Sequence, residues 1–427
     1  MGIVIPAFLV VISCLWIWRA CDGFEVASEY LGRNMTEGVR GGTINAISSS
    51  LPELLTTAIG LLLLNDTEGF SMGIGTTAGS ALFNGMIIPA VCILVVVGRA
   101  VRGKRVDSVD VATRVLRRDG LTLIACEVVL IVILAGRQLH WWQGLVLMCL
   151  YLSYLVYMLL SMKRADETDD EDGEEREGSD PPMTGVVAII VKTLTLGPIL
   201  DLESTFVRDK EREQIKAGTW NAWPLLLAAV AAIGASCLVL VRACEWLGSG
   251  PGNASHQSYF LFGREFSGIN MPTMFVAVIF ASMATSVPDT IMSLRDARDG
   301  DYDDAVANAL GSNIFDICFA LGLPLFLYTL IYGPIEMDTA TADQSTELRL
   351  LLVSFTICGF LTYYVGKRHT LEDGTRVVRM GRIRGLILLV LYSMFVAYII
   401  GRSQQAAWAM SISEFIHEIA AQLPAVG

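Results

Sequence analysis

The chain has 427 residues, of which 53% are apolar and 17% are charged, well below the roughly 25% charged residues of an ordinary soluble domain. Its 31 Lys and Arg against 43 Asp and Glu give a net charge of −12. This composition argues against a disordered chain and a soluble globular chain, and the acidic balance argues against a nucleic-acid-binding protein.

Apolar runs long enough to cross a bilayer recur along the chain, since a transmembrane helix needs about 20 residues. No Lys or Arg precedes the first run, so we expect a retained helix there and not a cleaved signal peptide. The ten predicted spans are about 3–22, 38–64, 71–98, 119–136, 141–162, 220–246, 270–294, 303–331, 348–366 and 384–402.

Lys and Arg concentrate in the loop after the third span and in the loop after the ninth. Positive charge marks the cytoplasmic side of a membrane protein, so this bias predicts an even number of spans with the N-terminus outside. We therefore expect a multi-pass protein of the cell membrane, and the compact length favours a bacterial inner membrane.

A hydrophilic stretch divides the predicted spans five and five. Its run 166–180 holds ten acids against one Arg, which predicts a solvated cytoplasmic segment, and the mildly apolar 183–200 after it predicts an interfacial helix. The expected parts are a first five-helix unit (1–162), this linker (163–219), a second five-helix unit (220–402) and an amphipathic tail (403–427). Apolar side chains of the tail are candidate interface anchors: Trp408, Ile412, Phe415 and Ile416.

The two halves share a weak internal repeat. The first half contains SSSLPELLTT and then GTTAGSALFNG, and the second contains ATSVPDTIMS and then ANALGSNIFDI. Because five spans is an odd number, the second copy enters the membrane from the opposite side. The sequence thus predicts an all-α integral membrane protein of ten transmembrane helices in two inverted five-helix repeats, with a binding site near the midplane between the α-repeats at about 38–98 and 270–331.

Three acids, Glu53, Asp289 and Asp316, fall inside apolar spans. A carboxylate at the bilayer centre costs roughly 2.5–3.5 kcal/mol even on the lenient insertion scale. No Lys or Arg lies near the middle of the ten predicted spans to pair with them. We therefore predict that their partner is a mobile cation.

Other oxygen-bearing side chains share helix faces with these acids or with one another, at spacings of three or four residues. These pairs are Ser50 with Glu53, Ser286 with Asp289, Ser80 with Asn84, and Ser312 with Asp316. Hard cations such as Ca²⁺ take oxygen ligands, and the sulfur and imidazole ligands of zinc or copper are absent from these motifs. Pro52 and Pro288 are expected to kink their helices and free the carbonyls of Ser48 and Ala284.

In combination these motifs resemble the cation/calcium exchanger superfamily, whose two signature α-repeats are inverted copies. The chain is most similar to the sodium/calcium exchanger family, and within it to the potassium-dependent sodium/calcium exchangers and prokaryotic homologues. The matching segments are SLPELLT at 50–56, GIGTTAGSALFN at 73–84, SVPD at 286–289, GSNIFDI at 311–317, and CDGF at 21–24, which closes the first predicted span.

The resemblance implies that Glu53 and Asp289 bind Ca²⁺ centrally and that hydroxyls on the following helices bind Na⁺. It also implies alternating access, in which the first and sixth helices slide past the rest. The further ligands that it implies are Ser50 and Ser286, Ser49 and Thr285 just before them, Asn84 and Asp316, the hydroxyls of Ser80 and Ser312, and the backbone carbonyls of Ala46 and Ser282.

The expected function is a secondary active antiporter that exports Ca²⁺ in exchange for Na⁺, with no cofactor and no obligate protein partner. Co-transport of K⁺ stays open, because Ca²⁺ plus K⁺ would neutralise three ionised carboxylates, whereas Ca²⁺ alone suffices if Asp316 is protonated. The alternatives are a Ca²⁺/H⁺ antiporter, a passive channel and an intramembrane aspartyl protease that uses Asp289 and Asp316. The GxGD element typical of such proteases does not occur at a predicted span.

Overall fold

The computed structural model describes residues 2–31, 33, 46–64, 66–101, 104–163, 201–251, 256–366, 368–371 and 374–422. The described chain is predominantly helical. The acidic run at 166–180 and the predicted interfacial helix at 183–200 lie outside the described residues, as does the part of the second predicted span before 46.

The first half of the chain forms a helix at each range predicted to be apolar. Its helices are α1 (Val4–Leu31), α3 (Ala46–Ser49), α4 (Leu51–Leu63), α5 (Asp66–Val96), α6 (Thr113–Ile133) and α7 (Trp141–Lys163). The prediction that CDGF closes the first span is wrong, because α1 continues to Leu31. Hydropathy missed this extension because its charged residues are paired: Arg19 donates to Asp22 over 3.0 Å.

The second half forms two short helices, α10 (Leu202–Phe206) and α11 (Asp209–Lys216), before its longer ones. The longer stretches are α12 (Trp223–Gly248); α13 (Thr273–Val276), η2 (Ala277–Ala281), α14 (Ser282–Thr285) and α15 (Val287–Asp299); α16 (Tyr302–Phe315), η3 (Asp316–Ala320) and α17 (Gly322–Tyr332); α18 (Thr339–Tyr364); α19 (Arg382–Ser403); and α20 (Ala407–Ala420).

The helix α18 begins nine positions before the predicted start at 348, and this moves one arginine into the bundle. Its N-terminus is capped by Asp338, whose side chain accepts from the backbone N–H of Thr341 over 2.8 Å. Arg349 is therefore buried in the helix, where it donates to the carbonyls of Ser345 (3.0 Å) and Ile131 (2.8 Å). Arg349, which the predicted span 348–366 places at its edge, thus lies inside the observed helix.

Seven of the described helices are long and apolar enough to cross a membrane, and the bent stretch from Thr273 to Asp299 makes an eighth. Long apolar side chains on the outer faces of α7 and α19 are exposed, as expected of surfaces that contact lipid: Leu152, Val156, Leu160, Ile383, Leu386, Val390 and Met394. The chain is therefore a predominantly helical, multi-pass membrane protein.

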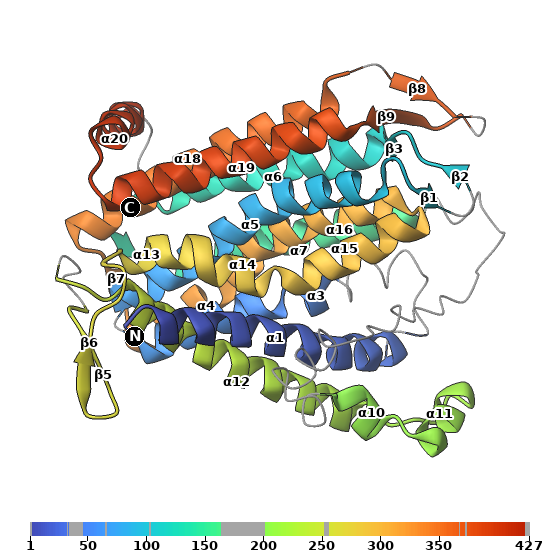
Figure 1. Ribbon diagram of the computed structural model, residues 1–427, viewed down its shortest axis with the longest axis horizontal. Coiled ribbons are helices and arrows are strands. Elements are labelled where there is room, and N and C mark those ends of the chain that lie inside the picture. The colour runs from blue at the N-terminus through green and yellow to red at the C-terminus, as the bar shows by residue number, and fades with distance from the viewer. Residues whose placement is uncertain are drawn as a thin grey trace.

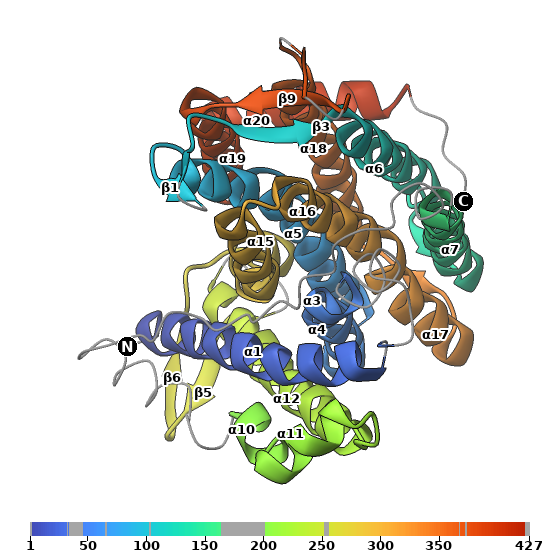
Figure 2. The same ribbon diagram turned by 90° about the vertical axis from the view of Figure 1, so that its right-hand side faces the viewer.

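The helices form three layers, best seen in Figure 2. α1 and α12 lie side by side along one face, and α6, α18 and α19 lie along the opposite face (Figures 1 and 2). Between these faces lie α3, α4 and α5 together with α13 to α16. The middle layer therefore contains both predicted α-repeats, side by side in the interior.

Short strands join loops of the two halves. At one end of the bundle β3 (Val109–Ala112) pairs antiparallel with β9 (Arg376–Met380), which also pairs with β8 (Arg368–Thr370). At the other end β4 (Gln138–Leu139) pairs with β7 (Ile335–Glu336). The remaining pairs are hairpins, β1 (Ala100–Val101) with β2 (Lys104–Arg105) and β5 (Tyr259–Leu261) with β6 (Arg264–Phe266).

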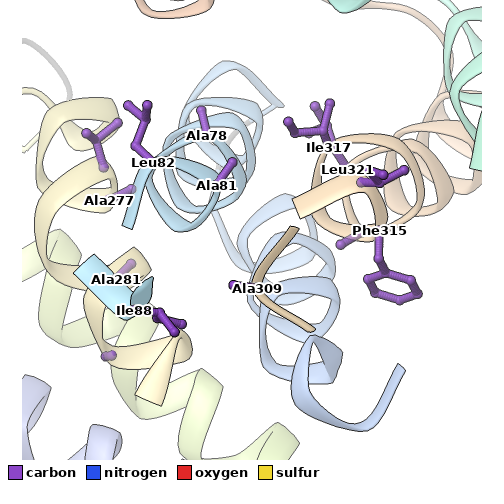
Figure 3. Close-up of a cluster of buried hydrophobic side chains, with 14 of the residues drawn as sticks. Ala78, Ala81, Leu82, Ile88, Ala277, Ala281, Ala309, Phe315, Ile317 and Leu321 are labelled. Carbon is purple, nitrogen blue, oxygen red and sulfur yellow. The ribbon is translucent and has the colours of Figure 1, made fainter. Parts of the chain in front are cut away.

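Small residues let α5 approach the second half closely. A Cβ atom on Gly79 would lie 2.3 Å from the carbonyl oxygen of Val278, and one on Gly75 would lie 2.6 Å from that of Met274. Two glycines four residues apart are typical of a close helix contact in a membrane, and a side chain at either position would collide with the backbone of the second half. Figure 3 shows further buried alanines of these helices, namely Ala78 and Ala81 on α5, Ala277 and Ala281 on η2, and Ala309 on α16.

The amphipathic tail folds as α20, and one of its four predicted anchors is wrong. Trp408, Ile412 and Phe415 are exposed, but Ile416 is buried. The reason is the docking of α20 onto α18 and α19, in which Ser413, one turn before Ile416, donates to Glu347 over 3.1 Å. The exposed apolar stripe therefore runs through Ile419 instead of Ile416.

Candidate functional site

Two helices of the middle layer break at equivalent positions. Ser50 (φ −97°, ψ 7°) separates α3 from α4, and Ser286 (φ −80°, ψ 3°) separates α14 from α15 with a bend of 45°. Each break lies two residues before a proline, which lacks the N–H that would continue the helix. The predicted kinks at Pro52 and Pro288 are thus confirmed.

Each break places a carboxylate in the first turn of the helix that follows. Glu53 lies in the first turn of α4, and Asp289 lies in the first turn of α15. The N-terminus of a helix carries a partial positive charge and favours an anion there. The third acid, Asp316, is the first residue of the π-helical turn η3, where its carbonyl accepts from Leu321 five residues later, over 3.1 Å.

Ser80 of α5 joins residues of both halves. Its Oγ lies 3.2 Å from Glu53 Oε1, 2.8 Å from Asp316 Oδ2 and 2.9 Å from Ser286 Oγ. Asn84 Nδ2, one turn further along α5, donates to the same hydroxyl over 3.2 Å. One hydroxyl thus connects α4, α5, η3 and the break before α15.

Asp289 is held by a second group of donors. Its Oδ2 accepts from Asn84 Nδ2 over 3.1 Å, and its Oδ1 accepts from Ser312 Oγ over 2.8 Å. Ser312 Oγ in turn lies 3.5 Å from Ser49 Oγ at the end of α3. The carboxylate of the second repeat is therefore bound by residues of the first repeat as well as its own.

The oxygens around Ser80 need one more proton or cation between them than the described side chains supply. A serine hydroxyl carries one proton, whereas the oxygens of Glu53 and Asp316 both lie within hydrogen-bond distance of Ser80 Oγ. If both carboxylates are ionised, one of them faces an oxygen with no proton between them. A bound cation or an added proton would remove this repulsion.

The unpaired oxygens at the centre support the same conclusion. Glu53, Asp289 and Asp316 are fully buried, and no Lys or Arg forms an ion pair with them among the described residues. Four buried oxygens at this centre, two of them on these acids, have no hydrogen-bond partner in the described part of the chain: Ser50 Oγ, Glu53 Oε2, Asn84 Oδ1 and Asp316 Oδ1. Buried anions without a partner are costly, and these oxygens are the ligands that a hard cation takes.

Not every predicted ligand is free to bind an ion in this conformation. The carbonyl of Ser282 accepts from Ser286 N (3.0 Å) and from Thr285 Oγ1 (3.1 Å). The Ser282 hydroxyl donates to Val278 O over 2.5 Å, and Ala46 begins α3. No group of three or more His, Cys, Asp and Glu side chains in the described ranges lies close enough to hold a metal ion, so hydroxyl, amide or backbone oxygens would complete any coordination shell.

Sequence reasoning missed two features beside the site. Cys237 of α12 donates from its thiol to the carbonyl of Pro52 over 3.6 Å, a contact between segments 185 positions apart. The π-helical turn η2 ends directly before Ser282, and the π-helical turn η3 begins at Asp316. Such turns are frequent at functional sites, but a single inserted residue leaves no periodic signal in so short a segment.

Comparison with known proteins adds independent findings. A family model described as "Sodium/calcium exchanger protein" matches residues 5–160 and 221–401. Sodium/potassium/calcium exchanger 4 of Homo sapiens is 37% identical over 139 residues, which is 31% of this chain and 20% of the relative. Sodium/potassium/calcium exchanger 5 of Homo sapiens is 24% identical over 379 residues, which is 77% of this chain and 71% of the relative.

The first of these relatives is thus matched over a fifth of its own length. Among solved structures, the H⁺/Ca²⁺ exchanger CAX has a TM-score of 0.55 at 11% identity, covering 98% of this chain and 91% of that one. The sodium-calcium exchanger NCX_Mj has a TM-score of 0.44 at 16% identity, covering 93% of this chain and 99% of that one. The match to CAX shows a shared fold.

Proposed function

The chain belongs to the sodium/calcium exchanger family of the cation/calcium exchanger superfamily, and we propose that it is a secondary active antiporter that exports Ca²⁺ in exchange for Na⁺. The family consists of ion exchangers and not of enzymes, which removes the aspartyl protease from consideration. The proposed activity needs no cofactor, because the ion gradient itself supplies the driving force.

The proposed architecture is ten transmembrane spans in two inverted five-helix repeats, with the N-terminus outside and the acidic linker in the cytoplasm of a bacterial cell. The units are 1–162 and 220–402, joined by 163–219 and followed by 403–427. The matching breaks at Ser50 and Ser286 support the repeat, because each is followed by a proline and an acid. The α3–α4 pair and α6 supply the two spans beyond those that length and composition identify.

One observation supports the ion site most strongly: Ser80 Oγ lies within hydrogen-bond distance of both Glu53 and Asp316. In our proposal Ca²⁺ binds between Glu53 and Asp289 and Na⁺ binds at the hydroxyls of Ser80 and Ser312. Ser49, Ser50, Asn84, Ser286, Thr285 and Asp316 supply further oxygens, and Ala46 and Ser282 supply carbonyls after the breaks rearrange.

Alternating access is supported by the layering of the helices. α1 and α12 pack against each other along one face (Figure 2), and α12 contacts the break in the first repeat through Cys237. A sliding movement of this pair would therefore act directly on the backbone beside Pro52. The site would then open toward one side of the membrane at a time.

A Ca²⁺/H⁺ antiporter is the second candidate, and the same observation favours it. A proton on Glu53 or Asp316 would supply the donor that is missing around Ser80 as well as a cation would. The two candidates differ in the coupling ion and not in the position of the site. Either antiporter could also carry K⁺, because Ca²⁺ together with K⁺ would neutralise three ionised carboxylates.

The test is uptake of radioactive Ca²⁺ by proteoliposomes that contain the purified protein. Uptake that requires Na⁺ inside and resists a protonophore supports Na⁺ exchange, with K⁺ added or omitted in separate arms. Uptake that is indifferent to Na⁺ and lost with the protonophore supports H⁺ exchange. Uptake with no counter-ion on the opposite side would show a passive channel and overturn the proposal.

A further inference from the structure

A cavity lies beside the candidate site, between α1, α3 and α15. It is small and partly open to the surface, and its wall includes Ser48 and Ser49, directly before the break at Ser50. It is also lined by three charged side chains, Asp22, Glu25 and Arg295. The cavity thus places charged groups next to the backbone that carries the first set of proposed ligands.

Arg295 lies between the two acids of α1. Its Nη2 is 3.8 Å from Asp22 Oδ1, and its Nη1 is 3.8 Å from Glu25 Oε2. A tight charge-assisted hydrogen bond between such groups measures about 2.7–2.9 Å, so both contacts are long. All three side chains are partly exposed, with 32%, 21% and 25% of the Arg295, Asp22 and Glu25 side-chain surfaces accessible.

A second arginine fixes one of these acids in place. Arg19 Nη1 donates to Asp22 Oδ2 over 3.0 Å, and its Nη2 lies 3.7 Å from Asp201 Oδ1. Asp22 therefore keeps its position through Arg19 and turns its other oxygen toward Arg295. Loss of the Arg295 contact would leave the acid in the cavity wall, available to another cation.

The position of Arg295 gives this contact a direction. Arg295 lies six positions after Asp289 along α15, and Asp22 and Glu25 lie in the second half of α1. α15 runs from the middle of the bundle, and α1 runs from the opposite end, toward the end that carries α10 and α11 (Figure 1). The contacts therefore lie between the candidate site and that end, across the boundary between α1 and α15.

We propose that Arg295 gates this side of the ion path and selects for positive charge. The proposal rests on the proposed antiport function. With the path closed, the guanidinium occupies the space between Asp22 and Glu25 and ties α15 to α1. A cation moving to or from the site takes its place between the two carboxylates, which attract cations and repel anions.

Cys21 allows the path to be probed without transport, because its side chain lines the same cavity and is buried, so a reagent reaches it only when the gate opens. The full-length protein in detergent is treated with two methanethiosulfonate reagents of similar size, one cationic and one anionic. Modification of Cys21 is followed by mass spectrometry of its peptide, and a Cys21→Ser variant identifies the signal. We expect the cationic reagent to react faster than the anionic one.

Arg295→Gln should raise the rate of the cationic reagent at Cys21 about tenfold, because an attractive site loses its fixed counter-charge. The double variant Asp22→Asn, Glu25→Gln should abolish the preference for the cationic reagent. Arg298→Gln is the matched control, since Arg298 lies one turn further along α15 and does not line the cavity. Arg295→Lys keeps the charge and should stay within about twofold of the wild type.

Each outcome decides one of the two proposals. Equal rates at Cys21 in Arg295→Gln and the wild type, or the same increase in Arg298→Gln, would overturn the gate. If Arg295→Gln does not fold, the double variant decides, and a preference for the cationic reagent that persists in it would overturn the proposal. A wild type that shows no Na⁺-dependent Ca²⁺ exchange in proteoliposomes contradicts the proposed function, while the Cys21 rates still measure the charge preference of the cavity.

Discussion

Asn84 donates its amide proton to the carboxylate of Asp289 over 3.1 Å, so the first repeat supplies a neutral donor to the acid of the second. The equivalent position in the second repeat is Asp316, which as a carboxylate has no proton to give to Glu53. The two halves thus have similar breaks and hydroxyls but differ by one charge at this position. The prediction for Asp316 given below follows from this difference.

Neutralising either acid that follows a break should abolish Ca²⁺ transport. Glu53→Gln and Asp289→Asn each remove one of the two charges that face Ca²⁺, and we expect exchange to fall to the level of empty liposomes. Folding should survive, because an unpaired buried charge is removed and not created. Chromatographic behaviour and Ca²⁺ uptake are measured together.

The matched control for these variants is Glu127→Gln. Glu127 is also a fully buried acid, but it lies on α6, where it accepts from Thr356 over 2.7 Å. Its variant should retain exchange within about twofold. Near-normal transport in Glu53→Gln or Asp289→Asn would show that the ion binds elsewhere.

Asp316→Asn should remove the effect of K⁺. The substitution lowers the charge of the site from −3 to −2, which Ca²⁺ alone neutralises, and it restores an amide donor opposite Ser80. We expect K⁺ to accelerate Na⁺-driven Ca²⁺ uptake by the wild type and to leave the variant unchanged. A wild type that is equally fast without K⁺ would contradict K⁺ co-transport and favour a protonated Asp316.

Adding a methyl group to Gly79 should separate α5 from η2. The new Cβ would lie 2.3 Å from the Val278 carbonyl, and overpacking of this kind costs about 1–3 kcal/mol. Because Ser80 is the next residue, transport should fall as well. The control is Gly234→Ala in α12, where no atom lies within 4 Å of the new Cβ.

We expect Gly79→Ala to lower the midpoint of thermal unfolding in detergent. Gly234→Ala should leave it unchanged or raise it slightly, because Ala is favoured over Gly in a helix by about 0.5–1 kcal/mol. Equal midpoints for the two variants would show that the contact between α5 and η2 is looser than the structure indicates.

His256 should make stability depend on pH. Its Nε2 lies 2.5 Å from Glu68 Oε2 on α5, and its Nδ1 lies 3.5 Å from Glu245 Oε1 on α12, which also pairs with Arg242. The hydrogen bond to Glu68 raises the pKa of His256 above its usual value of 6.5. The stabilisation is therefore fully present below about pH 6.5 and is lost as the pH rises through the higher pKa of the folded state.

The measurement is the midpoint of thermal unfolding between about pH 6 and pH 9. We expect the midpoint of the wild type to fall across this range and that of His256→Gln to fall less. His369→Gln is the control, because His369 lies in β8, away from Glu68. Parallel curves for the wild type and His256→Gln would refute the contribution of this contact.

Local sequence signals located the residues that the structure brings together around Ser80. A proline without an N–H breaks a helix wherever it stands in the interior, so the breaks near Pro52 and Pro288 could be located from sequence. Charge in an apolar span is equally local, and it identified Glu53, Asp289 and Asp316. The geometry around Ser80 supports this prediction, because four of the predicted ligands meet at its hydroxyl.

The features that the sequence did not predict depend on contacts between distant segments. The α1 helix extends past Asp22 because Arg19 and Arg295 balance its acids, and Arg295 lies 273 positions away. Arg349 is buried in α18 because carbonyls of two helices accept its protons. Hydropathy scores such residues as solvent-exposed, since it takes no account of a partner on another helix.

The paired strands at the two ends of the bundle join the loops around α6 to the loops around α18. α6 follows β3 and precedes β4, and these strands pair with β9 and β7, which lie on either side of α18. Main-chain hydrogen bonds thus brace α6 and α18 against each other at both ends. Among the described strands none joins α1 or α12 to this brace, since the hairpin after α12 pairs only with itself. We therefore expect α6 and α18 to keep their relative positions while α1 and α12 slide past them.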